Sequence, residues 1–387
     1  MNDAFANAPI VEGQSLPRFA PLRALFEQLL RDGDDVGASL AVTLDGEPVV
    51  DLWGGWCDEA RTARWTRDTL THVWSTTKTM VSLLALYLID RGELDPERPV
   101  AYYWPEFAAA GKAAIKVHHL LTHSSGLSGW AAPVTIADLC DWDRSTALLA
   151  AQEPWWEAGT ASGYHALNYG HLLGEVMRRI TGLKPGALLQ RELAGPLAAD
   201  FHIGLPDDAG ARVARVIAPP PLALDPGAMP PGSPAFRTFT NPAPDATVSQ
   251  DAAWCAADIG AANGHGNARS VARLQSLLSC GGALDGRRWL SPVTIERIFE
   301  CRIAGIDLVL GAPLRLGLGW GLPQPRLLPF IPAGRVAFWG GWGGSIVVAD
   351  ADRRICIAYM MNKMAPGIIG GPNAARLVAA AYAALES

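Results

Sequence analysis

Strand patterns occur near both ends of this chain, and helical patterns fill the middle. Near the start, GASLAVTLDGEPVVDLWGG (residues 37–55) predicts two strands joined at Asp45-Gly46, because Asp-Gly favours the tight turn of a β-hairpin. Near the end, three short β-rich runs follow one another, RVAFW, GSIVVAD and RICIAYMM, with a turn at Ala351-Asp352 between the last two. The simplest arrangement is one antiparallel sheet assembled from both termini.

A helical lobe is then expected between the two halves of this sheet, so the fold class is mixed α+β. Helical periodicity at 19–31 and 373–385 predicts terminal helices that flank the sheet, and Asn267 and Ser291 are predicted to cap two further helices. A chain of 387 residues exceeds one compact core, so its length suits one large two-lobed domain or two domains, and we expect the single domain. The expected division is an α/β lobe at about 1–93 and 305–387 and a mainly helical lobe at about 94–304, with a Pro/Gly-rich entrance loop at about 204–250.

The composition is that of a globular protein of enzyme size, with 49% hydrophobic and 18% charged residues. The net charge of −6 gives no basic footprint for nucleic acid. Six cysteines without a C-x-x-C motif favour reduced thiols over disulfides or a zinc site. The start, MNDAFANAPIVEGQ, lacks the pattern of a secretory signal, and the longest apolar run, around 80–90, is too short to span a membrane. We therefore expect a cytoplasmic protein with no membrane or nucleic-acid partner.

One of only five lysines lies at the head of an apolar helical pattern, VWSTTKTMVSLLALYLIDRG (residues 73–92). Positions three apart share one face of a helix, so Ser75 and Lys78 can place a hydroxyl beside an amine. A serine becomes a nucleophile when a neighbouring base takes its proton, and burial lowers the pKa of a lysine until it can act as that base. Unpaired N–H groups at the helix start suit an oxyanion. The structural alternative is an N-cap serine followed by a lysine that reaches solvent.

Two further segments could complete such a site. Tyr164 lies in GYHALNYGHLLGEVMRRITG (residues 163–182), between a glycine-containing loop and a helix. A phenolate beside Lys78 could serve as a general base, although a tyrosine there can also be simple packing. In AFWGGWGGSIVVAD (residues 337–350), four glycines around Trp342 allow close backbone approach. A backbone N–H from this segment could join that of Ser75 in an oxyanion hole, and the alternative is a bulged or tightly packed strand.

Together the three segments resemble the motifs of the serine β-lactamase and penicillin-binding protein superfamily, most closely its class C-like esterases, the family VIII carboxylesterases. YYWPEFAAAGKAAIKVHHLLTHSSGL (102–127) and NGHGNARSVARL (263–274) also look like family segments in the expected order. The resemblance implies an antiparallel sheet beside a helical lobe, with the site between them. It implies Ser75 as nucleophile, Lys78 as its proton-handling partner, and Tyr164 as the general base of acylation and the acid for the leaving alcohol.

The resemblance also places Trp339-Gly340-Gly341 where the lactamases carry K-T-G, and it pairs the N–H of Trp342 with that of Ser75 as the oxyanion hole. Two departures favour esters over lactams. Ala166 stands where lactamases of this class carry the asparagine of Y-x-N, and Trp339 replaces the lysine that could hold a substrate carboxylate. His165 is a further candidate for substrate binding, with a structural hydrogen bond as its alternative.

The expected activity is that of a serine carboxylesterase, which hydrolyses short-chain or small neutral esters through an acyl-enzyme on Ser75. No metal or organic cofactor is expected, and the small-molecule ester is the one partner expected. Alternatives on the same scaffold are a β-lactamase or D-amino-acid peptidase, a penicillin-binding-like receptor that is acylated but barely turns over, and an acyltransferase. His119 and His123 lie four apart, but the glutamate of H-E-x-x-H and a third ligand are missing, so capped or core histidines are expected. The tryptophans considered for an acyl pocket are Trp155, Trp156, Trp320, Trp339 and Trp342.

Overall fold

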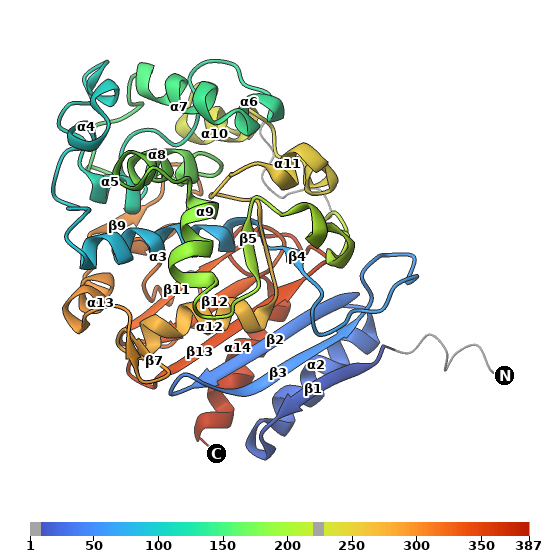
Figure 1. The fold of residues 1–387 in the computed structure, drawn as a ribbon. Coiled ribbons are helices and arrows are strands. Elements are labelled where there is room, and N and C mark those ends of the chain that lie inside the picture. Colours follow the sequence, from blue (N-terminus) through green and yellow to red (C-terminus); the bar gives the residue numbers. More distant parts are fainter. Residues whose placement is uncertain (1–8, 220–227, 387) are drawn as a thin grey trace.

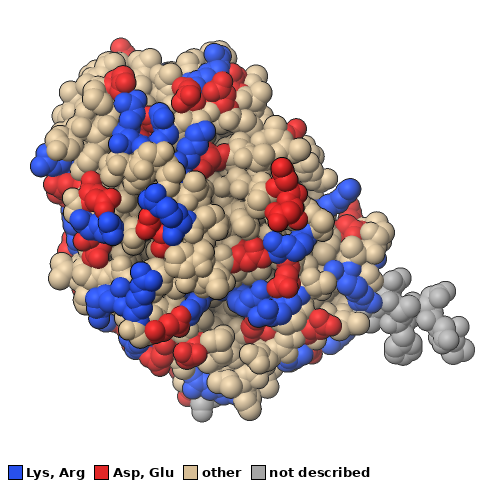
Figure 2. All heavy atoms as spheres, viewed as in Figure 1, with Lys and Arg blue, Asp and Glu red and all other residues tan. Residues whose placement is uncertain are grey.

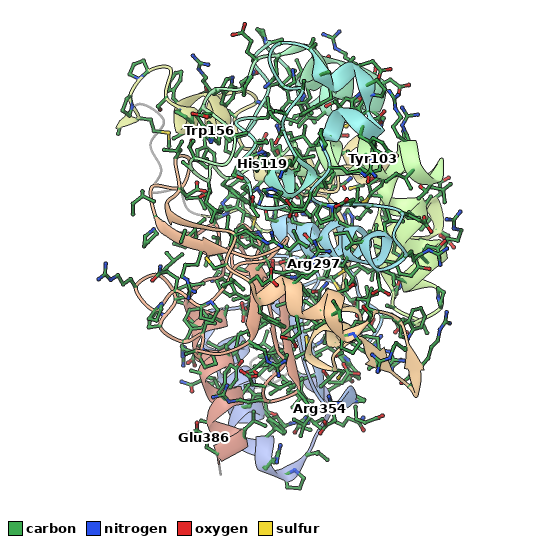
Figure 3. All side chains as sticks on the ribbon, turned by 90° about the vertical axis from the view of Figure 1, so that its left-hand side faces the viewer. Tyr103, His119, Trp156, Arg297, Arg354 and Glu386 are labelled. Carbon is green, nitrogen blue, oxygen red and sulfur yellow. The ribbon has the colours of Figure 1, made fainter. Side chains whose placement is uncertain are left out.

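The computed structural model describes residues 9–219 and 228–386 and divides into a sheet layer and a helical lobe. In Figure 1 the long strands lie in the lower half, and most of the short helices lie above them. Figure 3, turned by 90°, shows the same division, with His119 and Trp156 in the upper part and Arg354 in the lower part. The β-lactamase-like arrangement expected from the sequence, a sheet beside a helical lobe, is therefore confirmed.

A six-stranded antiparallel sheet forms the lower layer, in the order β1-β3-β2-β13-β12-β11. Strand β2 from the first part of the chain pairs directly with β13 from the last part, so both termini contribute to one sheet, as the strand patterns predict. In the β2–β3 turn, Asp45 and Gly46 have φ values of 53° and 85°, the left-handed values that this type of hairpin turn requires. The strands are β1 (Val11–Ser15), β2 (Gly37–Leu44), β3 (Glu47–Gly55), β11 (Val336–Gly340), β12 (Ile346–Asp350) and β13 (Ile355–Met361).

Helices cover both faces of this sheet. They are α2 (Ala20–Asp32) and α14 (Pro372–Glu386) on one face and α12 (Ala268–Ser279) on the other. On the first face, the Tyr359 hydroxyl of β13 donates to Asp35, which closely follows α2. On the opposite face, Thr43 of β2 is hydrogen-bonded to Ser276 of α12 at 2.7 Å. The two terminal helices therefore flank the sheet as expected.

Helix α12 departs from the expected division, because it falls within the predicted helical lobe but packs on the sheet. Its buried side chains include Val271, Leu274 and Leu278. The predicted cap is present, since the side chain of Asn267 accepts a hydrogen bond from the N–H of Ser270 at 3.0 Å. An amphipathic pattern predicts a helix with one buried face, but it does not say which layer that face covers.

The upper lobe is built from short helices joined by turns. The cap predicted at Ser291 is also found, since its hydroxyl accepts from the N–H of Thr294 at the start of α13 (Pro292–Phe299). Small sheets connect the lobe to the rest: β4 (Thr71–His72), β5 (Phe201–Ile203) and β6 (Gly264–Gly266), β7 (Ala283–Leu284) with β8 (Arg287–Arg288), and β9 (Ile303–Ile306) with β10 (Pro313–Leu316). The helices of the lobe are α4 (Val100–Tyr103), α5 (Val117–Leu121), α6 (Ile136–Cys140), α7 (Trp142–Ala151), α8 (Tyr169–Thr181), α9 (Pro185–Leu189), α10 (Pro234–Thr240) and α11 (Ala252–Ala256).

The predicted entrance loop at 204–250 is only partly irregular. Its described residues include η5 (Asp207–Arg212), α10 and η7 (Ala246–Gln250), whereas 220–227 lie outside the described residues. Asn241 ties the loop to the helical lobe, because its Nδ2 donates to the carbonyl oxygens of Trp130 and Ala132 at 2.8 Å each. This anchoring brings the following residues of the loop to the site described below.

The apolar helix α3 (Thr77–Asp90) runs between the helical lobe and the sheet (Figure 1). All of its residues except Tyr87 and Asp90 are buried, so it has no solvent-facing stripe. A helix that is apolar all round belongs in the core of a large domain. Lys78 is only 2% exposed, and it therefore does not reach solvent.

Charged side chains of both signs lie intermixed on the face drawn in Figure 2. That face offers no extended basic area of the kind that binds nucleic-acid phosphates. Across residues 9–219 and 228–386, no helix combines the length and the apolar character needed to cross a membrane.

Candidate active site

Ser75 lies in a constrained turn just before α3. It is the middle residue of the short turn η2 (Trp74–Thr76), and Trp74 has a φ of 48°. This left-handed conformation costs a non-glycine residue about 1–2 kcal/mol. The Thr77 hydroxyl donates to the Trp74 carbonyl oxygen at 2.5 Å, and the Trp74 N–H donates to His72 Nδ1 at 3.4 Å. The surrounding hydrogen bonds thus hold the serine in a strained turn, which is typical of functional sites.

Ser75, Lys78 and Tyr164 lie together in one group. Ser75 Oγ is 3.1 Å from Lys78 Nζ and accepts a hydrogen bond from the Tyr164 hydroxyl at 2.5 Å. Lys78 Nζ also lies 4.6 Å from the centre of the Tyr164 ring. All three residues are buried. The structure therefore brings the three predicted catalytic residues within hydrogen-bonding reach, although Tyr164 is 89 positions from the serine.

Two backbone carbonyls determine how the Lys78 amine faces the serine. Lys78 Nζ donates to the carbonyl oxygens of Ala166 and Ala261 at 2.8 Å each. Burial lowers the pKa of Lys78 well below its ordinary value, which favours the neutral amine. A neutral amine has two N–H groups and one lone pair. With both N–H groups on the carbonyls, the lone pair is left for the hydroxyl proton of Ser75.

A second buried lysine shows the contrasting arrangement. Lys112 is also inaccessible to solvent, and its Nζ donates to three carbonyl oxygens, those of Ala109, Ala150 and Gln152. Three acceptors match the three N–H groups of an ammonium and leave no lone pair free. Burial lowers the pKa of both lysines. The difference lies in the third neighbour of the amine, which is a carbonyl oxygen for Lys112 and a hydroxyl that can give up its proton for Lys78.

The pKa of the Tyr164 phenol is shifted in the opposite direction from that of Lys78. Burial raises the pKa of Tyr164, and the neighbouring Ser75 hydroxyl and Trp339 indole only partly offset this rise. A phenol with a raised pKa keeps its proton near neutral pH. In this resting geometry Tyr164 is thus the hydrogen-bond donor to Ser75 Oγ, and the amine of Lys78 is the available acceptor.

The glycine-rich turn after β11 packs directly against the turn that carries Ser75. A Cβ on Gly341 would overlap the carbonyl oxygen of Val73, so only glycine permits this contact. The Ser345 hydroxyl donates to the same carbonyl oxygen at 2.9 Å and fastens the two turns together. As a result Trp342 and Ser75 line one pocket. Within the described chain the N–H of Trp342 has no hydrogen-bond partner, as an oxyanion donor requires.

The other residues of the W-G-G segment lie behind the group and not in the pocket. The Trp339 ring centre is 5.6 Å from that of Tyr164, and the indole stacks on His123 at 5.7 Å. A Cβ on Gly340 would overlap the backbone nitrogen of Gly370. Gly340 and Gly341 therefore allow close packing, and neither lines the pocket in this structure.

His165 is also kept away from the pocket. It is fully buried, with Nε2 2.6 Å from the Ser125 hydroxyl and Nδ1 2.7 Å from the carbonyl oxygen of Gly163. Because both ring nitrogens have protein partners, neither is left for a substrate. The structure thus shows the structural hydrogen bonds that were the alternative to substrate binding.

An apolar pocket of about 60 Å³ opens beside Ser75. The entrance loop supplies part of its wall, including Phe239 and Val248, as its position in the sequence suggested. Within the described parts of the chain, Asp245 is the one charged residue in the lining. A small interior lined mainly by apolar side chains suits a compact apolar group.

The tryptophans of this pocket differ from those considered in the sequence. Trp342 lines it, whereas Trp155, Trp156, Trp320 and Trp339 do not. The structure adds two others, Trp74 and Trp254. Trp74 directly precedes Ser75, which was a usable signal. Trp254 is far away in sequence and is oriented by a hydrogen bond from its Nε1 to a histidine, His72, at 2.9 Å, which no motif indicates.

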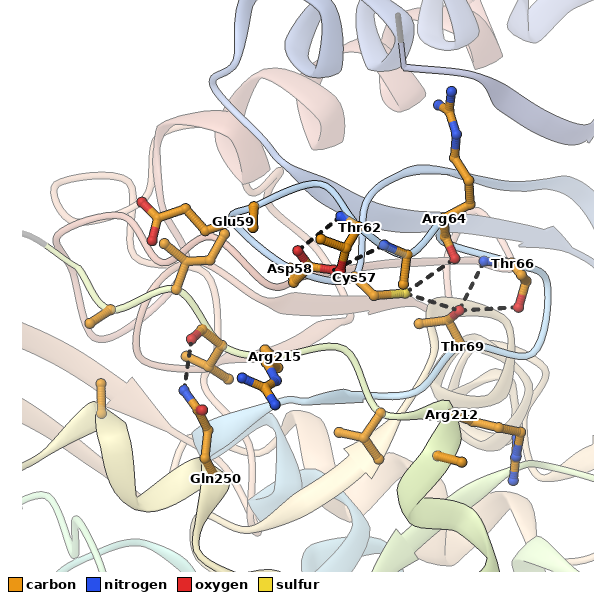
Figure 4. Close-up of a pocket in the computed structure, with 18 of the residues that line it drawn as sticks. Cys57, Asp58, Glu59, Thr62, Arg64, Thr66, Thr69, Arg212, Arg215 and Gln250 are labelled. Atoms are coloured by element: carbon orange, nitrogen blue, oxygen red, sulfur yellow. Dashed lines mark hydrogen bonds between the residues drawn. The ribbon is translucent and has the colours of Figure 1, made fainter. Parts of the chain in front are cut away.

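A larger cavity, of about 1000 Å³, lies on the other side of η7 (Figure 4). Figure 4 shows Asp58 hydrogen-bonded to Thr62 on one side of this space and Gln250 on the other. Burial raises the pKa of the Cys57 thiol in its wall, the opposite of what a reactive cysteine needs. Cys57 is therefore not activated as a nucleophile, and Ser75 and Tyr164 line the smaller pocket instead.

The histidines considered as metal ligands do not converge. His119 Nδ1 accepts from the N–H of Lys116 at the start of α5, and His123 Nδ1 accepts from the N–H of His165. Among the residues that the structure describes, no cluster of three or more His, Cys, Asp or Glu side chains could hold a metal ion. His119 is a helix-capping residue, and His123 packs in the core beside Tyr164.

One supporting residue near Tyr164 is absent from the sequence-based prediction. Asp307 accepts a hydrogen bond from the backbone N–H of Tyr164 at 3.0 Å and is fully buried. It is the one charged residue between Arg302 and Arg315 in an otherwise apolar stretch. A lone acid in such a stretch is the signal that could have marked it, since buried charges need a specific partner.

Comparison with known proteins identifies the family of the chain. The family model described as "Beta-lactamase" matches residues 22–381. The chain is 37% identical over 365 residues to "Esterase/beta-lactamase LipL" of Mycobacterium tuberculosis, covering 92% of this chain and 83% of that protein. It is 39% identical to a family VIII carboxylesterase of known structure, with a TM-score of 0.90 and coverage of 97% and 100% of the two chains. A penicillin-binding protein homologue from Caulobacter crescentus is also 39% identical, with a TM-score of 0.91 and the same coverage. These matches confirm the resemblance seen in the motifs, and the chain belongs to the β-lactamase family.

Proposed function

We propose that the protein is a serine esterase that hydrolyses short-chain or small neutral carboxylic esters through an acyl-enzyme on Ser75. The observation that carries this proposal is the position of Ser75 Oγ, between the amine of Lys78 at 3.1 Å and the phenol of Tyr164 at 2.5 Å. A serine between a proton acceptor and a proton donor, beside an apolar pocket, is the arrangement that acyl transfer needs. The esterase relatives support a hydrolase of β-lactamase fold.

Lys78 is proposed as the base of the acylation step. Its Nζ contacts two carbonyl oxygens and Ser75 Oγ. In the neutral amine the two N–H groups would bind the carbonyls, and the lone pair would face the hydroxyl of Ser75. As Ser75 Oγ bonds to the ester carbon, its proton passes to Lys78. The N–H groups of Ser75 and Trp342 hold the resulting oxyanion, an interaction worth about 3 kcal/mol for each donor in comparable sites.

Tyr164 is proposed as the proton donor to the departing alcohol. When the C–O bond of the ester breaks, the alkoxide takes a proton from the phenol, and the proton gained by Lys78 restores it. A water molecule then attacks the acyl-enzyme. Its proton passes to the neutral amine of Lys78, which gives it to Ser75 Oγ as the bond between Oγ and the acyl carbon breaks, and the carboxylic acid leaves. The family resemblance implies Tyr164 as the base. The lowered pKa of Lys78 and the raised pKa of Tyr164 instead favour Lys78 as the base and Tyr164 as the acid.

The substrate class follows from the lining of the pocket. Its walls are mainly aromatic and aliphatic, and no basic residue lines it within the described chain. The carboxylate of a β-lactam or a D-Ala peptide would therefore meet no cation there, while Asp245 would repel it. A free volume of about 60 Å³ suits short acyl groups better than long chains.

A substrate panel with a matched variant tests the proposal. Short p-nitrophenyl esters, nitrocefin and a D-Ala-D-Ala peptide are compared on the wild type, Ser75→Ala and Ser276→Ala. Ser276 is a buried serine on α12 and serves as the control. Ester turnover that is lost in Ser75→Ala but kept in Ser276→Ala supports the proposal, together with an acetyl adduct on Ser75 by mass spectrometry. The proposal fails if the wild type turns over no ester.

Lactam hydrolysis is the second candidate, because a relative at 37% identity is named both esterase and β-lactamase. On the present pocket it is expected as a side activity. Nitrocefin turnover faster than ester turnover in the same panel would reverse that order. A long-lived adduct without turnover would instead indicate a penicillin-binding-like receptor, and ester products that change with added alcohol would indicate acyl transfer.

A further inference from the structure

One carboxylate oxygen anchors the backbone of Tyr164. Asp307 Oδ1 accepts the N–H groups of Tyr164 at 3.0 Å and of Val309 and Leu310 at 2.9 Å each. Three donors converge on this one oxygen and occupy its acceptor positions. The other oxygen, Oδ2, is buried without a hydrogen-bond partner in the described part of the chain. Asp307 itself is 0% exposed.

The segment that carries Asp307 is also joined to the segment before Tyr164 by a bond that does not involve the carboxylate. The N–H of Leu308 donates to the carbonyl oxygen of Ser162 at 2.8 Å, which joins the same two segments by backbone alone. A neutral amide could also accept the N–H groups that Asp307 binds. An amide would bind the same N–H groups without the cost of burying a charge. The presence of a carboxylate at this position therefore needs a further explanation.

Asp307 is the acidic residue that acts on the pKa of Tyr164 in the described structure, and Asp245 is a second acidic residue in the lining of the same pocket. Lys78 Nζ lies over the ring at 4.6 Å, and the His123 ring centre lies at 5.3 Å. Burial lowers the pKa of both groups, which favours their neutral forms. The phenol of Tyr169 is a further neighbour, and burial raises its pKa. Burial is the main cause of the raised pKa of Tyr164, and the charge of Asp307 raises it further.

We infer that Asp307 is a positioning residue that orients Tyr164 and keeps its phenol protonated, so that Tyr164 gives a proton to the leaving alkoxide while Lys78 takes the proton of Ser75. This inference rests on the proposed esterase function. A negative charge at Asp307, bonded to the backbone of Tyr164, opposes formation of a phenolate. The charge of Asp307 would therefore determine which residue gives a proton and which takes one: Tyr164 gives and Lys78 takes.

The leaving group provides the first test. An alkoxide such as ethoxide needs a proton to depart, whereas p-nitrophenolate departs without one. Asp307→Asn keeps an acceptor oxygen and removes the charge. For ethyl butyrate, the alkaline limb of the kcat/KM profile should then fall by about one pH unit, because the phenol loses its proton more readily. For p-nitrophenyl butyrate the limb should stay within about 0.3 units, since this leaving group needs no acid.

Two further variants separate charge from position. Asp307→Ala removes the acceptor as well, and kcat for ethyl butyrate should fall about 10- to 100-fold with little change in KM, because Tyr164 is misplaced. Asp352→Asn removes an exposed acid that is paired with Arg335 and should leave every profile unchanged. Folded fractions from circular dichroism correct each rate. If Asp307→Asn keeps the wild-type profile, or shifts the acid limb and speeds the reaction, the inference is wrong.

A second measurement does not depend on turnover. With 3-fluorotyrosine placed at position 164, fluorine NMR follows the phenol through a pH titration in the wild type and in Asp307→Asn. The pKa at that position should fall by about one unit in the variant. An unchanged titration alongside normal ester hydrolysis would overturn the inference alone. A shifted titration in a protein that hydrolyses no ester would support the electrostatic role and reject the proposed function.

Discussion

Replacing Lys78 with methionine removes the amine 3.1 Å from Ser75 Oγ and keeps an unbranched chain in its place. General-base catalysis contributes about 10²–10⁴-fold, so we expect kcat/KM for a short ester to fall about a thousandfold. This loss corresponds to about 4 kcal/mol of transition-state stabilisation. The oxyanion donors and the pocket remain, so a low residual rate should persist.

Lys112→Met is the matched control, because this lysine is equally buried and also donates to backbone carbonyls. Each carbonyl left without a partner costs about 1–3 kcal/mol of stability. Lys112→Met orphans three carbonyls and Lys78→Met orphans two, so the control should lower the melting temperature at least as much. Its kcat/KM, corrected for folded fraction, should nevertheless stay within about twofold of the wild type, since no serine faces Lys112.

Initial rates with p-nitrophenyl butyrate between pH 5 and 10 provide the assay. In the wild type, kcat/KM should rise with pH as Lys78 loses its proton, and burial moves this rise well below the usual pKa of a lysine. The ammonium predominates below that pKa and cannot accept the proton of Ser75. If Lys78→Met keeps more than a tenth of the wild-type rate, or if both variants lose activity only in proportion to unfolding, the assignment of Lys78 as base is refuted.

Three other predictions concern the walls of the site. Trp342→Pro deletes the proposed oxyanion N–H and should lower kcat about 10²–10³-fold. Trp342→Ala keeps that N–H and should mainly alter KM. Equal losses of kcat for the two variants in stopped-flow assays would argue against the Trp342 N–H as an oxyanion donor. Gly341→Ala forces a Cβ into the carbonyl oxygen of Val73 and should destabilise the fold by about 1–3 kcal/mol in urea unfolding, while Gly210→Ala meets no atom within 4 Å and should be neutral. Asp245→Asn should raise kcat/KM about fivefold for an ester with a carboxylate on its acyl group and leave neutral esters unchanged, an effect that added salt should weaken; equal changes for both substrates would contradict it.

Local patterns predicted most of the elements around the site. The Asp45-Gly46 hairpin, the caps at Asn267 and Ser291 and the apolar helix α3 all depend on neighbouring residues, and the structure contains each of them. The proximity of the Ser75 hydroxyl and the Lys78 amine was predictable for the same reason, since a spacing of three residues places both on one side of a helical turn. The layer covered by α12 was not predictable, because its apolar face suits a sheet and a helix equally well.

The sequence by itself determined that strands from both termini form one sheet and that a serine and a lysine lie three residues apart at the start of a buried helix. Only the tertiary structure decided that Tyr164 donates to that serine, that carbonyls of Ala166 and Ala261 occupy the amine, and that His165 faces away. The reason is that periodicity and turn chemistry act over a few residues, whereas burial, lone-pair direction and pKa depend on groups that meet only when distant segments pack.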